Sequence, residues 1–207
     1  MRRWRRAAGA AMVRVVLLGS AVTLGGCAAL LGGGDKAVPT FDLTAPSGFT
    51  APRTGTGQIV IGNPTALAVL DTEKIVIEPA PGQITYLGGA QWADRLPALF
   101  QARLIQSFEN GSRSRSVARP GEQVVADYVL LTDIRQFGIQ TSGGGAEAVV
   151  SVSAKVVADR AGRIVAAQVF TARAPAANTK GPEVARALDE ASDQVFVEIV
   201  KWASARF

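Results

Sequence analysis

The sequence predicts an α+β protein, a two-layer sandwich in which two helices pack on one face of a mostly antiparallel sheet. The first observation is a series of three segments with alternating apolar residues, at residues 123–140, 146–159 and 163–173, joined by short glycine-containing turns. Such a series is typical of an antiparallel meander with one buried face. The second observation is the helical spacing of apolar residues at residues 91–110 and again from Pro182 onward.

The first 26 residues are predicted to be a lipoprotein signal peptide. A segment with five arginines and no acidic residue leads into an uncharged apolar stretch at residues 15–24, and Leu24-Gly25-Gly26-Cys27 has the form of a lipobox. Cys27 is the only cysteine of the chain, so we expect it to become the lipidated first residue of the mature protein. At about 1.5 Å per residue the apolar stretch covers roughly half of the ~30 Å hydrocarbon core, which argues against a transmembrane helix.

This lipobox resembles that of bacterial envelope lipoproteins. The resemblance implies a thioether-linked diacylglycerol on Cys27 and an acyl group such as palmitate on its amine, and two or more chains anchor a protein stably. Ala28 follows the cysteine where inner-membrane lipoproteins often carry Asp, so the usual sorting rule predicts the periplasmic face of the outer membrane. The alternatives for Cys27 are a small buried side chain or a free thiol after a different export signal.

The mature chain is predicted to be one formally neutral domain on a tether. Removing the five signal-peptide arginines from the 22 Lys and Arg leaves 17, which equals the 17 Asp and Glu. The sequence pI of about 9.9 is therefore no argument for a nucleic-acid partner. Residues 27–37 include three consecutive glycines and are expected to form a flexible lipidated tether. Residues 38–207 suffice for one domain of ordinary size.

Further short strands are predicted before the first helix. Their ranges are 38–44, 58–62, 74–78 and 82–87, with a loop at 46–57 and a polar edge strand at 112–118, while residues 63–72 fit either a strand extension or a loop. Pro97 is compatible with the first helix if Asp94 is its N-cap, because the proline then lies in the first turn. Trp92 would in that case pack from the entering chain, and we expect Arg103 to extend past the edge of the core.

The composition argues against common catalytic sites. The chain has no histidine, and its only cysteine is assigned to lipid, which removes the usual zinc ligands and the Ser-His-Asp triad. Two acidic pairs, Asp71 with Glu73 and Asp127 with Asp133, are interpreted as solvated turn and strand positions. A Ser-Lys pair stays open. We therefore expect no catalytic, cofactor-binding or metal-binding residues.

A basic segment precedes the predicted meander. Arg113, Arg115 and Arg119 lack the interleaved aromatic residues of nucleic-acid-binding surfaces. Charged residues on an edge strand discourage aggregation between strands. We interpret this segment as such an edge and expect no nucleic-acid partner.

A set of packing motifs runs through residues 39–202. They are an early Phe-x-Leu strand, an Ile-Thr-Tyr-Leu strand before Gln91-Trp92-Ala93-Asp94-Arg95-Leu96-Pro97, an Asp-Tyr-x-Leu strand and an Ala-rich final helix ending in Trp202. Together with the lipobox, these motifs resemble the ABC-type transport auxiliary lipoprotein family, the PqiC-like proteins. The motifs are packing signatures, so they point to a fold more directly than to an activity.

The resemblance implies an outer-membrane lipoprotein that serves a lipid-transport apparatus. In that apparatus an inner-membrane ABC transporter works with MCE-domain proteins that cross the periplasm. Our first hypothesis is a non-enzymatic docking component that binds an MCE-domain partner, with a homo-oligomer left open. The alternatives are a structural lipoprotein for outer-membrane assembly, acting on a barrel or on lipopolysaccharide export, and a periplasmic enzyme.

Overall fold

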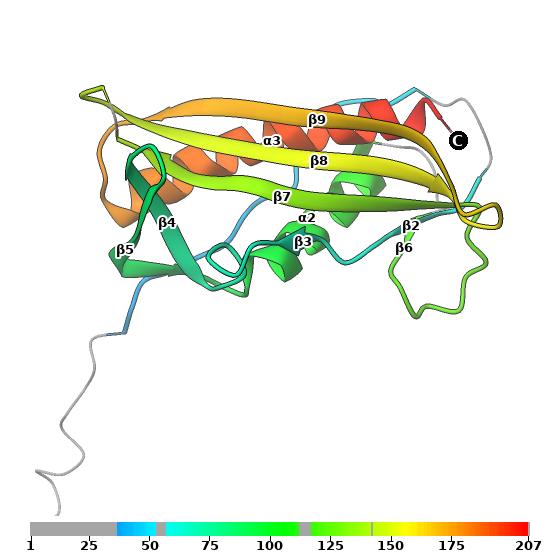
Figure 1. Cartoon of the computed structure of the whole chain (residues 1–207), viewed down its shortest axis with the longest axis horizontal. Coiled ribbons are helices and arrows are strands. Elements are labelled where there is room, and N and C mark those ends of the chain that lie inside the picture. Colours follow the sequence, from blue (N-terminus) through cyan, green and yellow to red (C-terminus); the bar gives the residue numbers. More distant parts are fainter. Residues whose placement is uncertain (1–36, 53–56, 112–116, 142, 207) are drawn as a thin grey trace, which may run out of the picture. The chain divides into compact units, whose positions relative to one another are not determined.

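The computed structural model of the chain describes residues 37–52, 57–111, 117–141 and 143–206 (Figure 1). The chain divides into two compact units, Met1–Ala37 and Val38–Phe207. The predicted signal peptide, Cys27 and all of the predicted tether except Ala37 lie outside the described residues. The fold below is therefore that of the second unit.

The described residues form two helices and a nine-stranded mixed sheet, which confirms the predicted α+β class. The longest pairings in the sheet are antiparallel. The elements are β1 (Thr40–Phe41), β2 (Ile59–Ile61), β3 (Thr65–Ala66), β4 (Lys74–Ala80), β5 (Gln83–Trp92), α2 (Leu96–Gly111), β6 (Val117–Ala118), β7 (Tyr128–Gln140), β8 (Ala146–Ala158), β9 (Arg163–Ala176) and α3 (Gly181–Ser204).

Strand β7 is the centre of the sheet. One edge pairs antiparallel with β8 over its whole length, and β8 pairs antiparallel with β9, as the predicted meander requires. The other edge of β7 pairs in succession with β2, β3 and β4, all parallel. Strand β4 then pairs antiparallel with β5, which carries the short β1 at its end.

Helix α3 packs against β7, β8 and β9 and lies behind these strands in Figure 1. Small β8 residues such as Ala148 and Ala154 are fully buried on this face of the sheet, which lets the helix approach closely. Helix α2 packs on α3 through Phe100 and Phe196, whose ring centroids are 4.8 Å apart. The predicted apolar face of α3 is confirmed as buried: Val184, Ala187, Leu188, Ala191, Val195, Ile199 and Trp202.

The first helix begins later than the sequence predicts. Strand β5 continues to Trp92, because the Trp92 backbone N–H donates to the Glu73 carbonyl at 2.7 Å and its buried ring meets the Phe137 ring edge-on at 5.8 Å. The helix starts at Leu96, so Pro97 lies in its first turn as expected. The Asp94 carboxylate accepts a hydrogen bond from the Arg95 N–H at the helix entry.

Several strand boundaries also differ from the predicted ones. Strand β7 begins at Tyr128 rather than at residue 123, since Gln123 has a positive φ of 56° that breaks the extended backbone. Strand β9 runs on to Ala176, because its inward alanines stay buried against α3 beyond the predicted end at residue 173. The first strand is only Thr40–Phe41. Of the predicted edge strand, β6 covers its last two residues, and residues 112–116 lie outside the described part.

The close approach of β4 to β7 depends on Gly138. A Cβ built at this position would lie 2.8 Å from the backbone oxygen of Val76. We expect Gly138→Ala to lower the free energy of unfolding by about 1–3 kcal/mol, because the backbone of β4 must move. Gly88→Ala is the control, since a Cβ there meets nothing within 4 Å. Thermal unfolding of the two variants measures the difference, and equal stabilities would contradict the packing argument.

Candidate functional site

The two faces of the sheet differ in what covers them. Alternate residues of β7, such as Leu130 and Ile134, are buried on the face that packs on α3. Their neighbour Leu131 turns to the opposite face, which we call the outer face, and is 45% exposed. On β9 the outer-face residue Val169 is 47% exposed. The outer face therefore presents apolar side chains to solvent, whereas the helix face does not.

A first hollow lies at the end of the outer face where β4 and β5 meet β7. Its volume is about 250 Å³. Leu67 and Ile84 stand at its rim with large exposed fractions. Tyr86 lies on the same face of β5, and its hydroxyl donates to the Val69 carbonyl at 3.3 Å. The lining residues are Leu67, Val69, Leu70, Val76, Glu78, Ile84, Arg135, Gln136, Phe137, Gly138 and Ser151.

A polar network borders this first hollow. The Glu78 carboxylate accepts hydrogen bonds from the side-chain amides of Gln136, at 2.9 Å, and Gln140, at 3.0 Å. Arg173 donates to the Gln140 amide oxygen at 3.3 Å and forms an ion pair with Glu147 at 2.6 Å. The network joins β4, β7, β8 and β9, so its polar atoms hold strands together. Sequence reasoning missed it, because these residues come from four separate segments.

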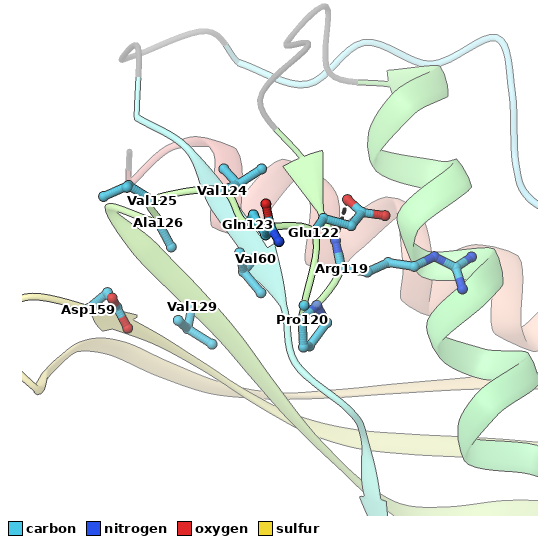
Figure 2. Close-up of a pocket in the computed structure, with 11 residues that line it drawn as sticks. Val60, Arg119, Pro120, Glu122, Gln123, Val124, Val125, Ala126, Val129 and Asp159 are labelled. Atoms are coloured by element: carbon cyan, nitrogen blue, oxygen red, sulfur yellow. Dashed lines mark hydrogen bonds between the residues drawn. The ribbon is translucent and has the colours of Figure 1, made fainter.

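A second hollow lies beside β2 and β7, under the loop that precedes β7 (Figure 2). Its volume is about 280 Å³. The register partners Val60 and Val129 form one side, and Val124 and Val125 stand on the loop with exposed side chains. The positive φ of Gln123 turns the loop at this point. The lining residues are Val60, Arg119, Pro120, Gly121, Glu122, Gln123, Val124, Val125, Ala126, Val129 and Asp159.

The loop beside the second hollow is closed by its own hydrogen bonds. The Arg119 backbone N–H donates to the Glu122 carboxylate at 3.0 Å, while the Arg119 side chain extends away towards α2 (Figure 2). The Asp159 backbone N–H donates to the Asp127 carbonyl at 2.9 Å. Both hollows are lined by a mixture of apolar and polar side chains.

Three of the four carboxylates in the acidic pairs that the sequence singled out have partners in other segments. Asp71 forms an ion pair with Arg95, and Asp127 accepts the backbone N–H of Gln58 at 3.0 Å. Asp133 accepts the Thr65 hydroxyl at 2.9 Å and lies six residues from Asp127, about 20 Å along an extended chain. Each carboxylate thus holds two segments together.

The remaining residues that the sequence singled out have structural surroundings or lie outside the described part. Arg103 forms an ion pair with Asp42, and its side chain is 20% exposed, which agrees with the predicted position at the edge of the core. Arg113 and Arg115 lie outside the described residues, as does Cys27, so lipidation at Cys27 stays a prediction. Within the described ranges no group of three or more His, Cys, Asp or Glu is placed to hold a metal ion.

A carboxyl with a raised pKa lies on the helix side of the sheet. Burial, with a smaller contribution from the charge of Asp189 one helical turn earlier, raises the pKa of Asp193 from 3.8 to about 6. Its Oδ1 atom is buried with no hydrogen-bond partner among the described residues. Asp189 accepts the Thr44 backbone N–H at 2.6 Å and its hydroxyl at 2.9 Å. The sequence gives no sign that Asp193 is partly buried, because the residue occupies a position of the helical pattern where a polar side chain is expected.

The open outer face and the helix-covered face together define a domain of α+β type. Its family follows from comparison with known proteins: the chain belongs to the ABC-type transport auxiliary lipoprotein component family, whose model matches residues 41–200. This confirms the resemblance drawn from the sequence motifs. No helix within the described residues is long and apolar enough to cross a membrane.

Individual relatives support the family and the fold. An uncharacterised protein of Bradyrhizobium diazoefficiens is 34% identical over 184 residues, and the match covers 86% of this chain and 48% of that protein. The chain thus spans about half the length of this curated relative. A crystal structure from Xanthomonas campestris is 27% identical with a TM-score of 0.74 and covers 79% of this chain and 93% of its own. A hypothetical protein of Chlamydia trachomatis, at 12% identity and a TM-score of 0.51 over 73% of this chain and 98% of its own, shows the fold alone.

The raised pKa of Asp193 gives a pH-dependent stability. Between 3.8 and about 6 the folded state holds more protons than the unfolded state, so stability falls as pH rises through this interval. We expect Asp193→Asn to raise the free energy of unfolding at pH 7 by about 1 kcal/mol, since partial exposure screens the charge. At pH 4 the gain should vanish. Denaturant titrations at the two pH values measure it, with Glu190→Gln on the exposed side of α3 as control. A gain of equal size at both pH values would contradict the argument.

Proposed function

We propose that the protein is a non-catalytic docking component of an ABC-driven lipid-transport system, anchored at the periplasmic face of the outer membrane by lipid on Cys27. Its partner is an MCE-domain protein and, through it, an inner-membrane ABC transporter. The family membership supports the auxiliary role. The observation that carries the docking role is the distribution of exposed apolar side chains over the surface of the described residues.

Exposed large hydrophobic residues gather on the outer face and at its margins. Within the described residues none of them lies on α2 or α3, whose exposed positions are small or polar. On α3 these include Arg186, Glu190 and Lys201. The described exposed hydrophobics of the outer face and its margins are Leu67, Ile84, Tyr86, Leu131, Ile164, Val165 and Val169, with Val124 and Val125 beside the second hollow. Apolar residues gathered in this way are typical of a surface that binds another molecule.

The arrangement of layers fits this proposal. Helix α3 packs on β7, β8 and β9, and α2 packs on α3, which supports a two-layer arrangement whose outer face is left to the partner. The two hollows, of about 250 and 280 Å³, lie towards opposite ends of that face and accept apolar side chains of a bound protein. Three of the four carboxylates of the predicted acidic pairs, those of Asp71, Asp127 and Asp133, are held by structural partners, which supports a binding role over an enzymatic one.

The lipid anchor would act by raising the effective concentration of the domain near its partner. A domain confined to the membrane surface meets a partner on the same path at a high effective concentration, so weak contacts on the outer face suffice for stable docking. Loss of the anchor would then abolish docking while leaving the contact surface intact.

The anchor is tested by Cys27→Ala. We expect the variant to leave the outer-membrane fraction and to fail in complementing a deletion strain for outer-membrane phospholipid content. Fractionation and lipid analysis measure the two effects. The matched control is Ala28→Ser, which leaves the cysteine in place and should behave as wild type. Full complementation by a soluble Cys27→Ala protein would overturn the anchoring role.

The docking face is tested by photocrosslinking in living cells. A photoreactive amino acid at Leu131 or Ile84 should capture an MCE-domain protein, whereas the same probe at Glu190, on the solvent-facing side of α3, should not. Mass spectrometry of the captured adduct identifies the partner. Capture of a barrel or a lipopolysaccharide-export protein at Leu131 would instead support the alternative function in outer-membrane assembly. Equal capture at all three positions would contradict a specific docking face.

A further inference from the structure

The first hollow has a buried apolar floor and an exposed apolar rim. Leu70 and Val76 line it and are buried, whereas Leu67 and Ile84 are 72% and 47% exposed. The hollow therefore has depth, so an apolar group lying in it would lose contact with water. Concave sites with apolar walls and a few polar groups are typical of ligand-binding sites.

The wall of this hollow is held in place by hydrogen bonds within the domain. The Leu70 backbone N–H donates to the Leu67 carbonyl at 2.8 Å, which closes this segment into a turn. The Tyr86 hydroxyl then joins the turn to β5 through the Val69 carbonyl. The hollow is thus formed by the fold itself, which lowers the ordering cost of binding.

A β-bulge places Arg135 at the border of the hollow. The register of β7 with β8 shifts between Ile134 and Gln136, which leaves Arg135 as an extra residue of β7. Ile134 and Phe137 are both buried on the helix face, so the two residues between them both leave that face. Bulges change the direction of a side chain and are common beside functional sites.

The guanidinium of Arg135 has hydrogen-bond donors to spare. Within the described part of the chain it makes no hydrogen bond, and its ion pair with Asp133 runs through Nε at 3.7 Å, which is beyond hydrogen-bond distance. The side chain is 52% exposed. A guanidinium in this state can bind a carboxylate or a phosphate through two parallel hydrogen bonds.

The other polar side chains that line the hollow already have partners. The Glu78 carboxylate accepts the side-chain amide of Gln136 at 2.9 Å, and the Ser151 hydroxyl shares a hydrogen bond with Thr171 at 2.9 Å. The side-chain donors left for a ligand are therefore mainly those of Arg135. They call for an anionic acceptor next to an apolar body.

We propose that the first hollow binds a single-chain anionic amphiphile, with its apolar chain against Leu70 and Val76 and its carboxylate or phosphate on Arg135. A cavity of about 150 Å³ holds benzene, so a hollow of about 250 Å³ accepts one chain of roughly ten carbons. The two chains of a phospholipid do not fit. The inference rests on this hollow and on Arg135, and it does not rest on the proposed docking function.

The charge of Glu78 gives the proposal a sign that can be measured. Glu78 also lines the hollow, and its carboxylate would repel an anionic head group. The amides of Gln136 and Gln140 hold this carboxylate, so we expect the head group at the Arg135 end. Removing the charge of Glu78 should tighten binding, whereas removing the charge of Arg135 should weaken it.

The test is photolabelling of the full expressed chain in nanodiscs of phosphatidylcholine. The probes are decanoic acid, decanol and decylamine, each with the same diazirine on its chain, and mass spectrometry locates the label. We expect the acid to label residues 67–70 and Ile84 at least about fivefold more than the amine does, because only the acid forms charge-assisted hydrogen bonds with Arg135. Equal labelling by the acid and the amine, or absence of label from these residues, would overturn the proposal.

Charge variants test the contact with the head group. Arg135→Gln should lower labelling by the acid at least about fivefold and leave labelling by decanol unchanged, which shows that the hollow is intact. Glu78→Gln should raise labelling by the acid. Arg186→Gln, on the exposed side of α3, is the matched control and should behave as wild type. Unchanged labelling of Arg135→Gln by the acid would contradict the proposal.

Competition distinguishes a single-chain ligand from a membrane lipid. Unlabelled decanoate should displace the acid probe, and octanoate should do so several-fold less well, since each buried methylene raises affinity by roughly two- to fourfold. Exchanging part of the phosphatidylcholine for phosphatidylglycerol should leave the labelling unchanged. Displacement by phosphatidylglycerol would overturn the single-chain assignment. Crosslinking of a partner at Leu131 does not use this hollow, so the proposed docking function and this inference can fail separately.

Discussion

The fold depends on the pairing of β7 along both of its edges. One edge holds β8 through an almost continuous antiparallel register, and the other edge is shared by three short parallel strands. Leu130, Ile134 and Phe137 are buried on its helix face, so a slip of one residue would move them to the outer face. The apolar pattern of this one strand therefore fixes the positions of β2, β3 and β4 as well as the meander.

The candidate site follows from the same arrangement. Between β3 and β4 the chain leaves the edge of β7, and the departing segment with Leu67 and Val69 forms a wall of the first hollow. Beside this first hollow, a register shift in β7 at Arg135 changes the direction of the strand. The second hollow forms where the pairing of β2 with β7 begins and the loop with Gln123 lies beside Val129. Both hollows therefore lie beside the limits of regular pairing with β7.

The sequence predicts those helices and strands in which apolar residues recur at a regular spacing. The buried face of β8 and the buried stripe of α3 were predictable residue by residue, because one side of each element faces the core and the other does not. The parallel pairing of β2 and β3 with β7 was not predictable, since strands of two or three residues carry no measurable period. The start of α2 was misplaced because Trp92 fits the helical spacing, yet its buried ring packs from the end of β5. The outer face emerges only once distant segments are aligned.

The N-terminal segment of the domain has a mechanical consequence. The described chain enters through Thr40–Phe41, held to β5 by the Gln91 N–H on the Pro39 carbonyl at 3.1 Å and the Ala93 N–H on the Phe41 carbonyl at 2.7 Å. Next along the chain, Thr44 is held by Asp189 of α3. A force pulling on the N-terminal side of the domain would load these few bonds first. The long ladders of β7, β8 and β9 would carry load only after this segment had detached, so the outer face would keep its shape under moderate tension.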